Sequence, residues 1–346
     1  MIDPWYEQNV VCPRDHLSLK PRDGQLVCEH GHLYPVVDGI PVLLLDDLPQ
    51  TMQIAEASLQ RAKTWSVEDD SPPHLYLETL GISDKEKAEL IAFARDHENT
   101  PVDPVVQYIV AATSGHFYKE SQGRLTSYPI PEIRLPPGTG ARLLDLGCNW
   151  GRWSIAAARR GYDVVGLDPS LGAVMAARRV NRQLGLTAHF VVADARYLPF
   201  PRSATDVVFS YSVLQHLSDE NFERCVCEAN RVLKSGGLCC MQMASAFGIR
   251  SLYHQARRGF RAANGFDVRY RSPLALRRLF ERKIGEARIA VDCYFGLGLQ
   301  PADAWMMSSG KQSLINFSEL LRRMSDFLAP LKYAADSVYL CAVKPR

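Results

Sequence analysis

The chain has 346 residues, of which 47% are hydrophobic and 23% are charged, and these proportions are those of a globular protein of roughly two domains. A formal net charge of +2 gives no global electrostatic attraction to nucleic acid, and no apolar run approaches the ~20 residues that span a bilayer. The N-terminal residues lack the features of a secretory signal, and nine cysteines without the spacing of a small disulfide scaffold favour a reducing compartment, so we expect a cytoplasmic protein.

Residues 1–48 are predicted to form a small β module, because strand-like pieces alternate here with turn sequences. Two of these turns are Asp23-Gly24 and Asp38-Gly39. The strand-like pieces are residues 26–29, 32–37 and 40–45. The module resembles a zinc ribbon, a small β fold in which two C-x-x-C knuckles bind the metal.

Both knuckles of this ribbon-like module are incomplete. Cys12 and Cys28 occupy the first position of each knuckle, whereas Asp15 and Gly31 stand where the second cysteine belongs. One hypothesis is a metal site made of Cys12, His16, Cys28 and His32. We favour the interpretation that the ribbon kept its shape and lost its metal, so no metal ligand is predicted. The module also offers a surface to a protein partner.

Residues 49–135 are predicted to form a mostly helical connector, with a loop at residues 69–73. Ser83 and Glu86 form a capping box that opens the first of two helices. These helices are expected over residues 86–98 and 104–113. The connector then carries Tyr118, Lys119, Arg124 and Tyr128. These side chains either form a lid over a ligand or pack a helix against a sheet edge, and we favour packing.

A strand, a glycine-bearing turn and a helix follow one another over residues 142–161. The apolar run Leu143-Leu144-Asp145-Leu146 is typical of a strand that is buried on both faces, and a helix is expected from Arg152. Such a turn presents backbone N–H groups and a helix N-terminus to a ligand. The dinucleotide pattern G-x-G-x-x-G is excluded, because Asn149 and Arg152 occupy two of its glycine positions.

The same turn resembles the first motif of the class I S-adenosylmethionine (SAM) methyltransferases, an acidic residue followed by G-x-G-x-G. Asp145, Gly147 and Gly151 match this motif, and Asn149 replaces its central glycine. Asparagine tolerates a left-handed backbone, so the turn can keep its shape. The resemblance implies that the turn, which includes Cys148, binds SAM.

Later positions extend the resemblance at the expected intervals. Asp168 ends the second strand about 20 residues past the turn, where a carboxylate can accept both ribose hydroxyls. Asp194, followed by Ala195, ends the third strand, and the resemblance implies that it contacts the adenine amino group. Ser210 and Tyr211 follow the fourth strand and are expected to face SAM.

We therefore expect an α/β fold, in which residues 136–346 form a Rossmann-like seven-stranded sheet of mostly parallel strands with an antiparallel last strand. A Gly236-Gly237 turn is expected to precede the fifth strand, and a helical insertion is expected near residues 300–330. This insertion would cover the active site.

Methyl transfer is an in-line displacement, so such an enzyme mainly positions the donor methyl group against a nucleophile. A base is required only when the acceptor loses a proton. His216, expected with Gln215 at the start of the helix after the fourth strand, is the candidate base because imidazole titrates near neutrality. The competing interpretation is a histidine that only packs.

The acceptor is predicted to be an oxygen or nitrogen of a small molecule, such as a metabolite or a glycan or lipid precursor. The N/D-P-P-Y run of adenine methylation is absent after the fourth strand, and Cys239 and Cys240 lie in an apolar strand where cysteine is usually inert. A ribosomal or transfer RNA methyltransferase is one alternative, since residues 250–283 are rich in arginine. Solvated helix faces explain the arginines equally well. A non-catalytic SAM-binding partner protein is the other alternative.

Overall fold

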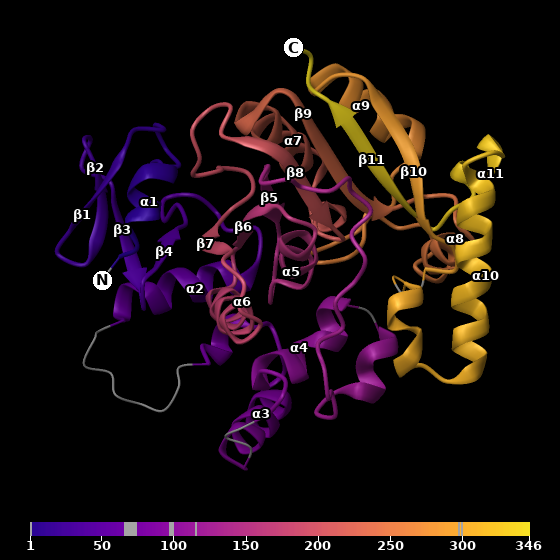
Figure 1. Ribbon diagram of the computed structural model, residues 1–346, viewed down its shortest axis with the longest axis horizontal. Coiled ribbons are helices and arrows are strands. Elements are labelled where there is room, and N and C mark those ends of the chain that lie inside the picture. The colour runs from indigo at the N-terminus through magenta and orange to yellow at the C-terminus, as the bar shows by residue number, and fades with distance from the viewer. Residues whose placement is uncertain (1, 66–74, 97–99, 115, 297, 299) are drawn as a thin grey trace.

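The computed structural model describes residues 2–65, 75–96, 100–114, 116–296, 298 and 300–346. Its centre is an 11-stranded sheet in the order β1-β2-β3-β4-β7-β6-β5-β8-β9-β11-β10 (Figure 1). The strands are β1 (Leu19–Arg22), β2 (Gln25–Cys28), β3 (Leu33–Val37), β4 (Ile40–Leu43), β5 (Arg142–Leu146), β6 (Asp163–Asp168), β7 (His189–Ala193), β8 (Thr205–Tyr211), β9 (Leu233–Ala244), β10 (Ala287–Cys293) and β11 (Ser337–Val343).

The part of the sheet from β7 to β10 has the expected Rossmann-like arrangement. Strands β7, β6, β5, β8 and β9 pair in parallel, and the last strand of the chain, β11, runs antiparallel to both β9 and β10. This confirms the predicted seven-stranded sheet of mostly parallel strands with an antiparallel last strand. Strand β5 lies in its middle, so the glycine turn that follows β5 lies at the centre of the sheet edge.

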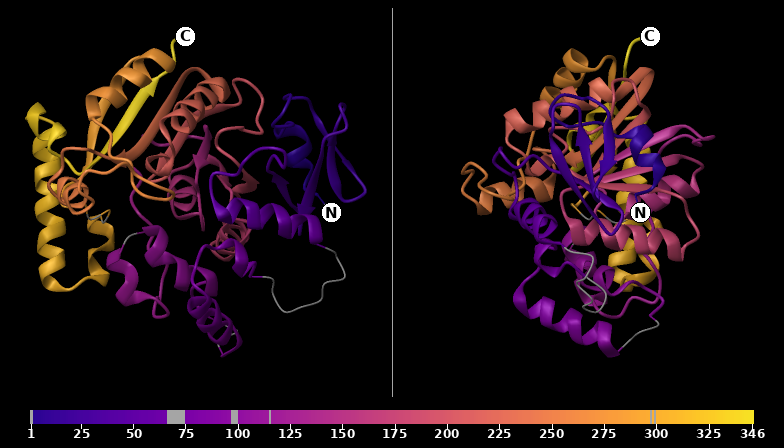
Figure 2. Two further views of the ribbon diagram at one scale, coloured as in Figure 1. Left: turned by 180° about the vertical axis from the view of Figure 1, so that it is seen from behind. Right: turned by 90° about the vertical axis from the view of Figure 1, so that its left-hand side faces the viewer.

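Helices lie on both sides of the sheet (Figure 2). The α-helices are α1 (Pro4–Asn9), α2 (Gln53–Thr64), α3 (Asp84–Asp96), α4 (Pro104–Ser114), α5 (Arg152–Arg159), α6 (Leu171–Gln183), α7 (Asp219–Val232), α8 (Ile249–Arg257), α9 (Pro273–Lys283), α10 (Ser309–Ser325) and α11 (Ala329–Tyr333). The 3-10 helices are η1 (Leu77–Thr79), η2 (His116–Ser121), η3 (Leu214–His216) and η4 (Pro301–Met306). No helix within the described residues is both long and apolar enough to cross a membrane.

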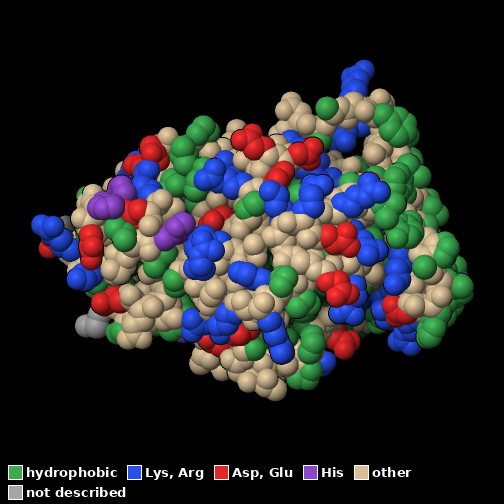
Figure 3. Space-filling model, turned by 90° about the horizontal axis from the view of Figure 1, so that it is seen from above, with side chains coloured by type: hydrophobic (Ala, Val, Ile, Leu, Met, Phe, Trp, Pro, Cys, Tyr) green, Lys and Arg blue, Asp and Glu red, His purple; other side chains and the backbone are tan. Residues whose placement is uncertain are grey.

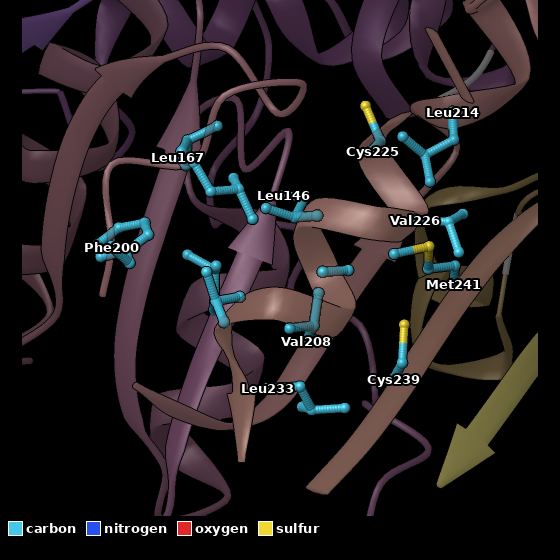
Figure 4. Packing of buried hydrophobic residues seen from close by; sticks show 14 of the residues in the cluster. Leu146, Leu167, Phe200, Val208, Leu214, Cys225, Val226, Leu233, Cys239 and Met241 are labelled. Carbon is cyan, nitrogen blue, oxygen red and sulfur yellow. The ribbon is translucent and has the colours of Figure 1, made fainter. Parts of the chain in front are cut away.

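Successive residues of the central strands point to opposite faces, as the period of a strand requires. Leu146 of β5 packs in one cluster with Cys225 and Val226 of α7 (Figure 4). Leu143 of the same strand packs in another cluster, with Trp153 of α5. Burial on both faces explains why residues 143–146 of β5 are apolar except for Asp145.

The N-terminal module is joined to the edge of this sheet. Strand β4 pairs in parallel with β7, with Val42 opposite Val192 and Leu43 opposite Ala193. The hydroxyl of Tyr6 also donates a hydrogen bond of 2.8 Å to the carbonyl of Phe190 in β7. The predicted ribbon is therefore an extension of the sheet on the side of β7.

The predicted capping box at Ser83 and Glu86 is confirmed. The N–H of Ser83 donates to Oε2 of Glu86 at 2.9 Å, and the N–H of Glu86 donates back to Oγ of Ser83 at 3.3 Å. Helices η4, α10 and α11 lie where the sequence predicted a helical insertion. The predicted loop at residues 69–73 and the expected end of α3 at residues 97–98 lie outside the described residues.

Two predictions about the helix that follows β8 and about the glycine pair are wrong. Gln215 and His216 do not open that helix, because they lie in η3, and α7 begins at Asp219 after the N-cap Ser218. The Gly236-Gly237 pair does not precede a strand but lies inside β9, where the register with β8 shifts.

The cysteine count did not predict a disulfide, yet the structure contains one. Cys240 in β9 and Cys341 in β11 lie directly opposite in the strand register and form a disulfide bond. The other seven cysteines are free thiols, and Cys239 is buried as expected.

Candidate active site

The turn after β5 depends on three residues with a left-handed backbone. The φ angles of Gly147, Asn149 and Gly151 are +74°, +48° and +83°. A Cβ atom at Gly147 would lie 2.3 Å from Cγ2 of Val213, so both the backbone and the space require glycine there. Oδ1 of Asn149 accepts the N–H of Trp150 at 2.8 Å, which explains how asparagine replaces the central glycine.

Asp168, at the end of β6, is hydrogen-bonded to this turn. Its Oδ2 accepts the N–H of Asn149 at 2.9 Å, and its Oδ1 accepts the N–H of Ser170 at 2.9 Å. Burial raises the pKa of Asp168 to about 6, although both hydrogen bonds oppose that shift. The structure thus brings the turn and this carboxyl together, as the sequence predicted.

Asp145 and Cys148 point their side chains into the protein interior. Asp145 is 1% exposed, and its Oδ2 accepts a hydrogen bond of 2.7 Å from the hydroxyl of Ser154. Burial raises its pKa to about 7, the Ser154 hydroxyl opposes this shift, and the charge of Asp168 adds to it. The thiol of Cys148 packs so closely over β6 that a Cβ at Gly166 would lie 2.9 Å from it. Both side chains therefore support the turn from the side of the protein interior and do not face a ligand.

Asp194, at the end of β7, is paired with an arginine. Its Oδ2 accepts from Nε and Nη2 of Arg196 at 2.9 and 2.7 Å, and its Oδ1 accepts the Arg196 N–H at 2.8 Å. Ala195 lies between them and is partly buried. Arg196 also donates to the carbonyl of Pro49 and so ties this loop to the start of the connector.

Ser210 and Tyr211 do not take the places that we expected. Ser210 is fully buried, and its hydroxyl donates to the carbonyl of Leu146 at 2.9 Å, so it links two strands instead of facing a ligand. The hydroxyl of Tyr211 donates to Oδ2 of Asp292 at 2.9 Å. Burial raises the pKa of Tyr211 well above its usual value, so the phenol stays protonated.

His216 is held by the segment between α8 and α9. Its Nδ1 lies 2.7 Å from the carbonyl of Phe266, an acceptor, so Nδ1 carries the proton and Nε2 keeps its lone pair. The imidazole stacks on the ring of Phe266 with centroids 3.9 Å apart. Burial lowers the pKa of His216, which keeps the ring neutral at pH 7.

Sequence reasoning missed a buried ion pair beside the turn. Arg152, at the start of α5, donates from Nη2 to both carboxylate oxygens of Asp303 at 3.1 and 3.0 Å. The hydroxyl of Tyr118 lies 2.8 Å from the same Nη2 and accepts from it. The pair joins α5, η4 of the helical insertion, and η2 of the connector. No local pattern could reveal it, because the two charges are 151 residues apart.

A second buried polar group lies beneath Tyr211. Asp292 of β10 accepts from Tyr211, from Nε2 of Gln242 at 3.1 Å and from the hydroxyl of Ser337 at 3.0 Å. Nη1 of Arg134 also donates to its Oδ1 at 3.3 Å. These contacts join four neighbouring strands, β8, β9, β11 and β10, to the connector.

The aromatic residues of the connector pack, as we favoured. Tyr118 is fully buried, and the Tyr128 hydroxyl accepts the N–H of Asp103 at 2.7 Å and donates to Oε1 of Gln183 at 2.6 Å. The ring of Tyr128 also lies against that of Trp150, with centroids 5.9 Å apart.

Three arginines of residues 250–283 serve internal contacts. Arg269 donates to the carbonyl of His216 at 2.6 Å, and Arg271 donates to the carbonyl of Leu217 at 2.7 Å. Arg258 donates to the carbonyl of Val268 at 3.2 Å. On the face in Figure 3, lysine and arginine side chains are interspersed with acidic ones. These three arginines therefore serve the fold and are not available to bind RNA.

The N-terminal module brings together four side chains that can bind a metal, but not the four considered above. Cys12, Asp15, Cys28 and His32 each offer a ligand atom, and these atoms all lie within 4.8 Å of one another. Asp15 thus takes the place that we considered for His16. Burial raises the pKa of the Cys12 thiol to about 11.

Comparison with known proteins agrees with the geometry of the turn. Residues 143–237 match the family model described as a methyltransferase domain. The ubiquinone biosynthesis O-methyltransferase of Cereibacter sphaeroides is 37% identical over 102 residues, which are 30% of this chain and 40% of that protein. The malonyl-[acyl-carrier protein] O-methyltransferase of Serratia marcescens is 32% identical over 113 residues, 33% of this chain and 42% of that protein. The chain thus spans about two fifths of the length of these relatives.

Solved structures are similar at lower identity. A phosphoethanolamine N-methyltransferase of Haemonchus contortus is 19% identical, with a TM-score of 0.41, over 61% of this chain and 50% of that one. The magnesium protoporphyrin IX methyltransferase of Synechocystis is 16% identical, with a TM-score of 0.41, over 61% of this chain and 76% of that one.

The strand order, the left-handed turn beside Asp168 and the match over residues 143–237 agree with one another. Residues 143–237 thus match a methyltransferase domain and are similar to the class I SAM-dependent family.

Proposed function

We propose that the chain transfers the methyl group of SAM to an oxygen or nitrogen of a small molecule in the cytoplasm. The observation that carries this proposal is the contact between the glycine turn and Asp168. That contact places a carboxylate at the carboxyl ends of β5 and β6, where ligands bind in open α/β sheets.

The hydrogen-bonding capacity of two carboxylates supports SAM as the cofactor. A carboxylate offers about four lone-pair positions, and backbone N–H groups fill two of those on Asp168. The remaining two match the two hydroxyls of a ribose. On Asp194, three positions are filled by Arg196, which leaves one acceptor position for the adenine amino group.

The proposed cofactor site is therefore smaller than the sequence predicted. It consists of the backbone of the turn, from Gly147 through Cys148 and Asn149 to Gly151, together with Asp168 and the loop at Asp194 and Ala195. Asp145 orients the turn from behind through Ser154. Ser210 and Tyr211 are not part of the proposed cofactor site, because their hydroxyls donate hydrogen bonds to Leu146 and Asp292 of neighbouring strands.

SAM supplies an electrophilic methyl group on its sulfonium sulfur. The protein has to hold the acceptor in line with that methyl group and to exclude water. We assign the removal of the acceptor proton to Nε2 of His216. The hydrogen bond to Phe266 fixes the proton on Nδ1 and leaves the lone pair on Nε2. The side-chain nitrogen of Gln215 lies 3.4 Å from this Nε2, so the acceptor has to displace that contact.

A small-molecule acceptor fits the elements around the sheet edge better than RNA does. The connector and the helical insertion meet over α5 through the Arg152–Asp303 pair. Three of the arginines that would serve RNA, Arg258, Arg269 and Arg271, are bound to backbone carbonyls instead. Both curated relatives named above are O-methyltransferases, which supports an oxygen acceptor. A protein partner on the N-terminal module has less support, since the module is paired with β7.

The test has two parts. Calorimetry with the full chain should show SAM binding, and incubation with SAM and a panel of phenols, carboxylates and amines should release S-adenosylhomocysteine only where an acceptor is present. SAM binding without turnover of any acceptor would favour the non-catalytic alternative, and absence of SAM binding would contradict the proposal.

The role of His216 can be tested separately with the acceptor found in that panel. His216→Gln should lower turnover about 100-fold or more while leaving SAM affinity unchanged, because only proton removal is lost. His254→Gln is the matched control, since His254 lies exposed on α8. Equal turnover in the two variants would show that His216 only packs.

A further inference from the structure

We propose that Cys12, Asp15, Cys28 and His32 bind one Zn²⁺ ion in a tetrahedral site that stabilises the N-terminal module. This inference reverses our expectation from the sequence that the ribbon had lost its metal. It concerns a site outside the methyltransferase domain and does not depend on the proposed catalytic function.

Four of the six distances between the donor atoms are close to those that tetrahedral zinc requires, and all six are within 4.8 Å. Zinc binds sulfur at about 2.3 Å and nitrogen or oxygen at about 2.0–2.1 Å, so the edges of such a tetrahedron measure roughly 3.3–3.8 Å. Nδ1 of His32 lies 3.5 Å from Sγ of Cys12, 3.2 Å from Sγ of Cys28 and 3.2 Å from Oδ2 of Asp15. Sγ of Cys28 lies 3.6 Å from the same Oδ2. The four donors are thus spaced as ligands of one ion.

The turn that follows Cys12 explains why Asp15, and not His16, is the fourth ligand. The N–H of Leu17 donates to Oδ1 of Asp15 at 3.0 Å, which leaves Oδ2 facing the two thiols. The next residue, His16, has a left-handed backbone with a φ angle of +60°. His16 lines a separate hollow of about 250 Å³ with Arg196 and other residues, and its ring nitrogens are not among the clustered donor atoms.

The turn between Cys28 and His32 positions these two residues as the other two ligands. The N–H of Gly31 donates to the carbonyl of Cys28 at 2.9 Å, and the N–H of Cys28 donates to the carbonyl of His32 at 3.1 Å. Gly31, with a φ angle of +81°, allows the chain to reverse between Cys28 and His32. Glycine at this position therefore serves the turn, while the histidine one residue later supplies the ligand.

Neighbouring side chains provide the outer contacts that metal ligands usually have. The hydroxyl of Tyr34 lies 3.1 Å from Sγ of Cys12, and Nδ1 of His30 lies 2.9 Å from Oδ2 of Asp15. Cys12 and Cys28 are 0% and 4% exposed, so the sulfur atoms are shielded from solvent. Two thiolates and an imidazole select a borderline-soft ion with four ligands, which is zinc in preference to magnesium or calcium.

The metal would join three segments of a module with a small core of its own. Cys12 follows α1, Cys28 ends β2, and His32 immediately precedes β3. Small folds commonly need such a link, and the free energy of metal binding then contributes to folding. Because β4 of this module pairs with β7, loss of the metal should loosen the sheet edge that carries Asp194.

The first experiment measures metal content. The full chain, purified without chelators, should contain about one zinc per molecule by elemental analysis. Cys12→Ser and His32→Ala should lower this to about a tenth. Cys227→Ser and His16→Ala are the matched controls and should keep the metal, because Cys227 lies exposed on α7 and His16 lies outside the cluster.

The second experiment remains informative if those variants fail to fold. Asp15→Cys restores the C-x-x-C knuckle and should keep one zinc and release it to a chelator about tenfold more slowly than the parent. Cobalt bound to the demetallated parent should show the absorption of tetrahedral Co²⁺ with thiolate ligands, and chelation should lower the parent's melting temperature by several degrees. Zinc retained by Cys12→Ser, a Cys12–Cys28 disulfide in the purified chain, or a parent that binds neither zinc nor cobalt would overturn the proposal.

Discussion

The backbone N–H of Asn149 donates a hydrogen bond of 2.9 Å to Oδ2 of Asp168 and joins the glycine turn after β5 to the end of β6. This contact holds the turn in its left-handed shape and aims the carboxylate at the same edge of the sheet. The shape of the turn and the position of the carboxylate in the proposed cofactor site therefore both depend on the contact between Asn149 and Asp168.

Replacing Asp168 should weaken SAM binding. Asp168→Ala removes the acceptor of both ribose hydroxyls, and the loss of such charged hydrogen bonds is worth about 2 kcal/mol, or ~30-fold in affinity. Asp163→Ala, at the partly exposed start of the same strand, is the control and should bind SAM like the parent. Calorimetry that finds equal SAM affinity in the two variants, or NAD binding to the parent, would contradict the assignment.

SAM affinity should depend on pH through Asp168. Burial raises its pKa to about 6 in the free protein, so the carboxyl is mostly protonated below pH 6 and ionised above pH 7. Only the ionised form can accept two hydroxyls. Affinity should therefore fall by up to about tenfold between pH 6 and 5 and stay constant between pH 7 and 8. Asp168→Asn should bind weakly with no such slope, and a parent with constant affinity from pH 5 to 8 would refute this role.

The Arg152–Asp303 pair should be essential to stability. Asp303→Ala leaves the Arg152 guanidinium buried without its partner, and this typically costs about 3–5 kcal/mol of unfolding free energy. The double variant Arg152→Met with Asp303→Leu should lose less, because no charge remains buried. Asp326→Ala, on the exposed C-cap of α10, is the control. Chemical denaturation measures all three, and a double variant as unstable as Asp303→Ala would contradict this argument.

RNA binding should be weak and nearly independent of salt. If residues 250–283 gripped RNA through six phosphates, affinity would fall about a thousandfold or more between roughly 50 and 200 mM salt. We expect no such slope, and the triple change of Arg257, Arg258 and Arg261 to serine should leave SAM affinity unaltered. Tight RNA binding that collapses with salt and with these three changes would instead favour the RNA alternative.

The sequence by itself determined the central sheet and the glycine turn. Burial of β5 on both faces, the capping box at Ser83 and the left-handed backbone at Asn149 all follow from rules that act within a few residues. The period of a strand, a capping sequence and the backbone preference of asparagine are properties of a short segment, so these features can be recognised without the rest of the chain.

Only the tertiary structure decided which distant groups meet. Arg152 pairs with Asp303, Tyr211 with Asp292, and β4 with β7, across separations that no local period encodes. In the N-terminal module, too, the sequence could not tell which side chains meet, although these residues are close in the chain. Spacing alone could not separate His16 from Asp15, because a single left-handed residue decides which side chain turns toward Cys28 and His32.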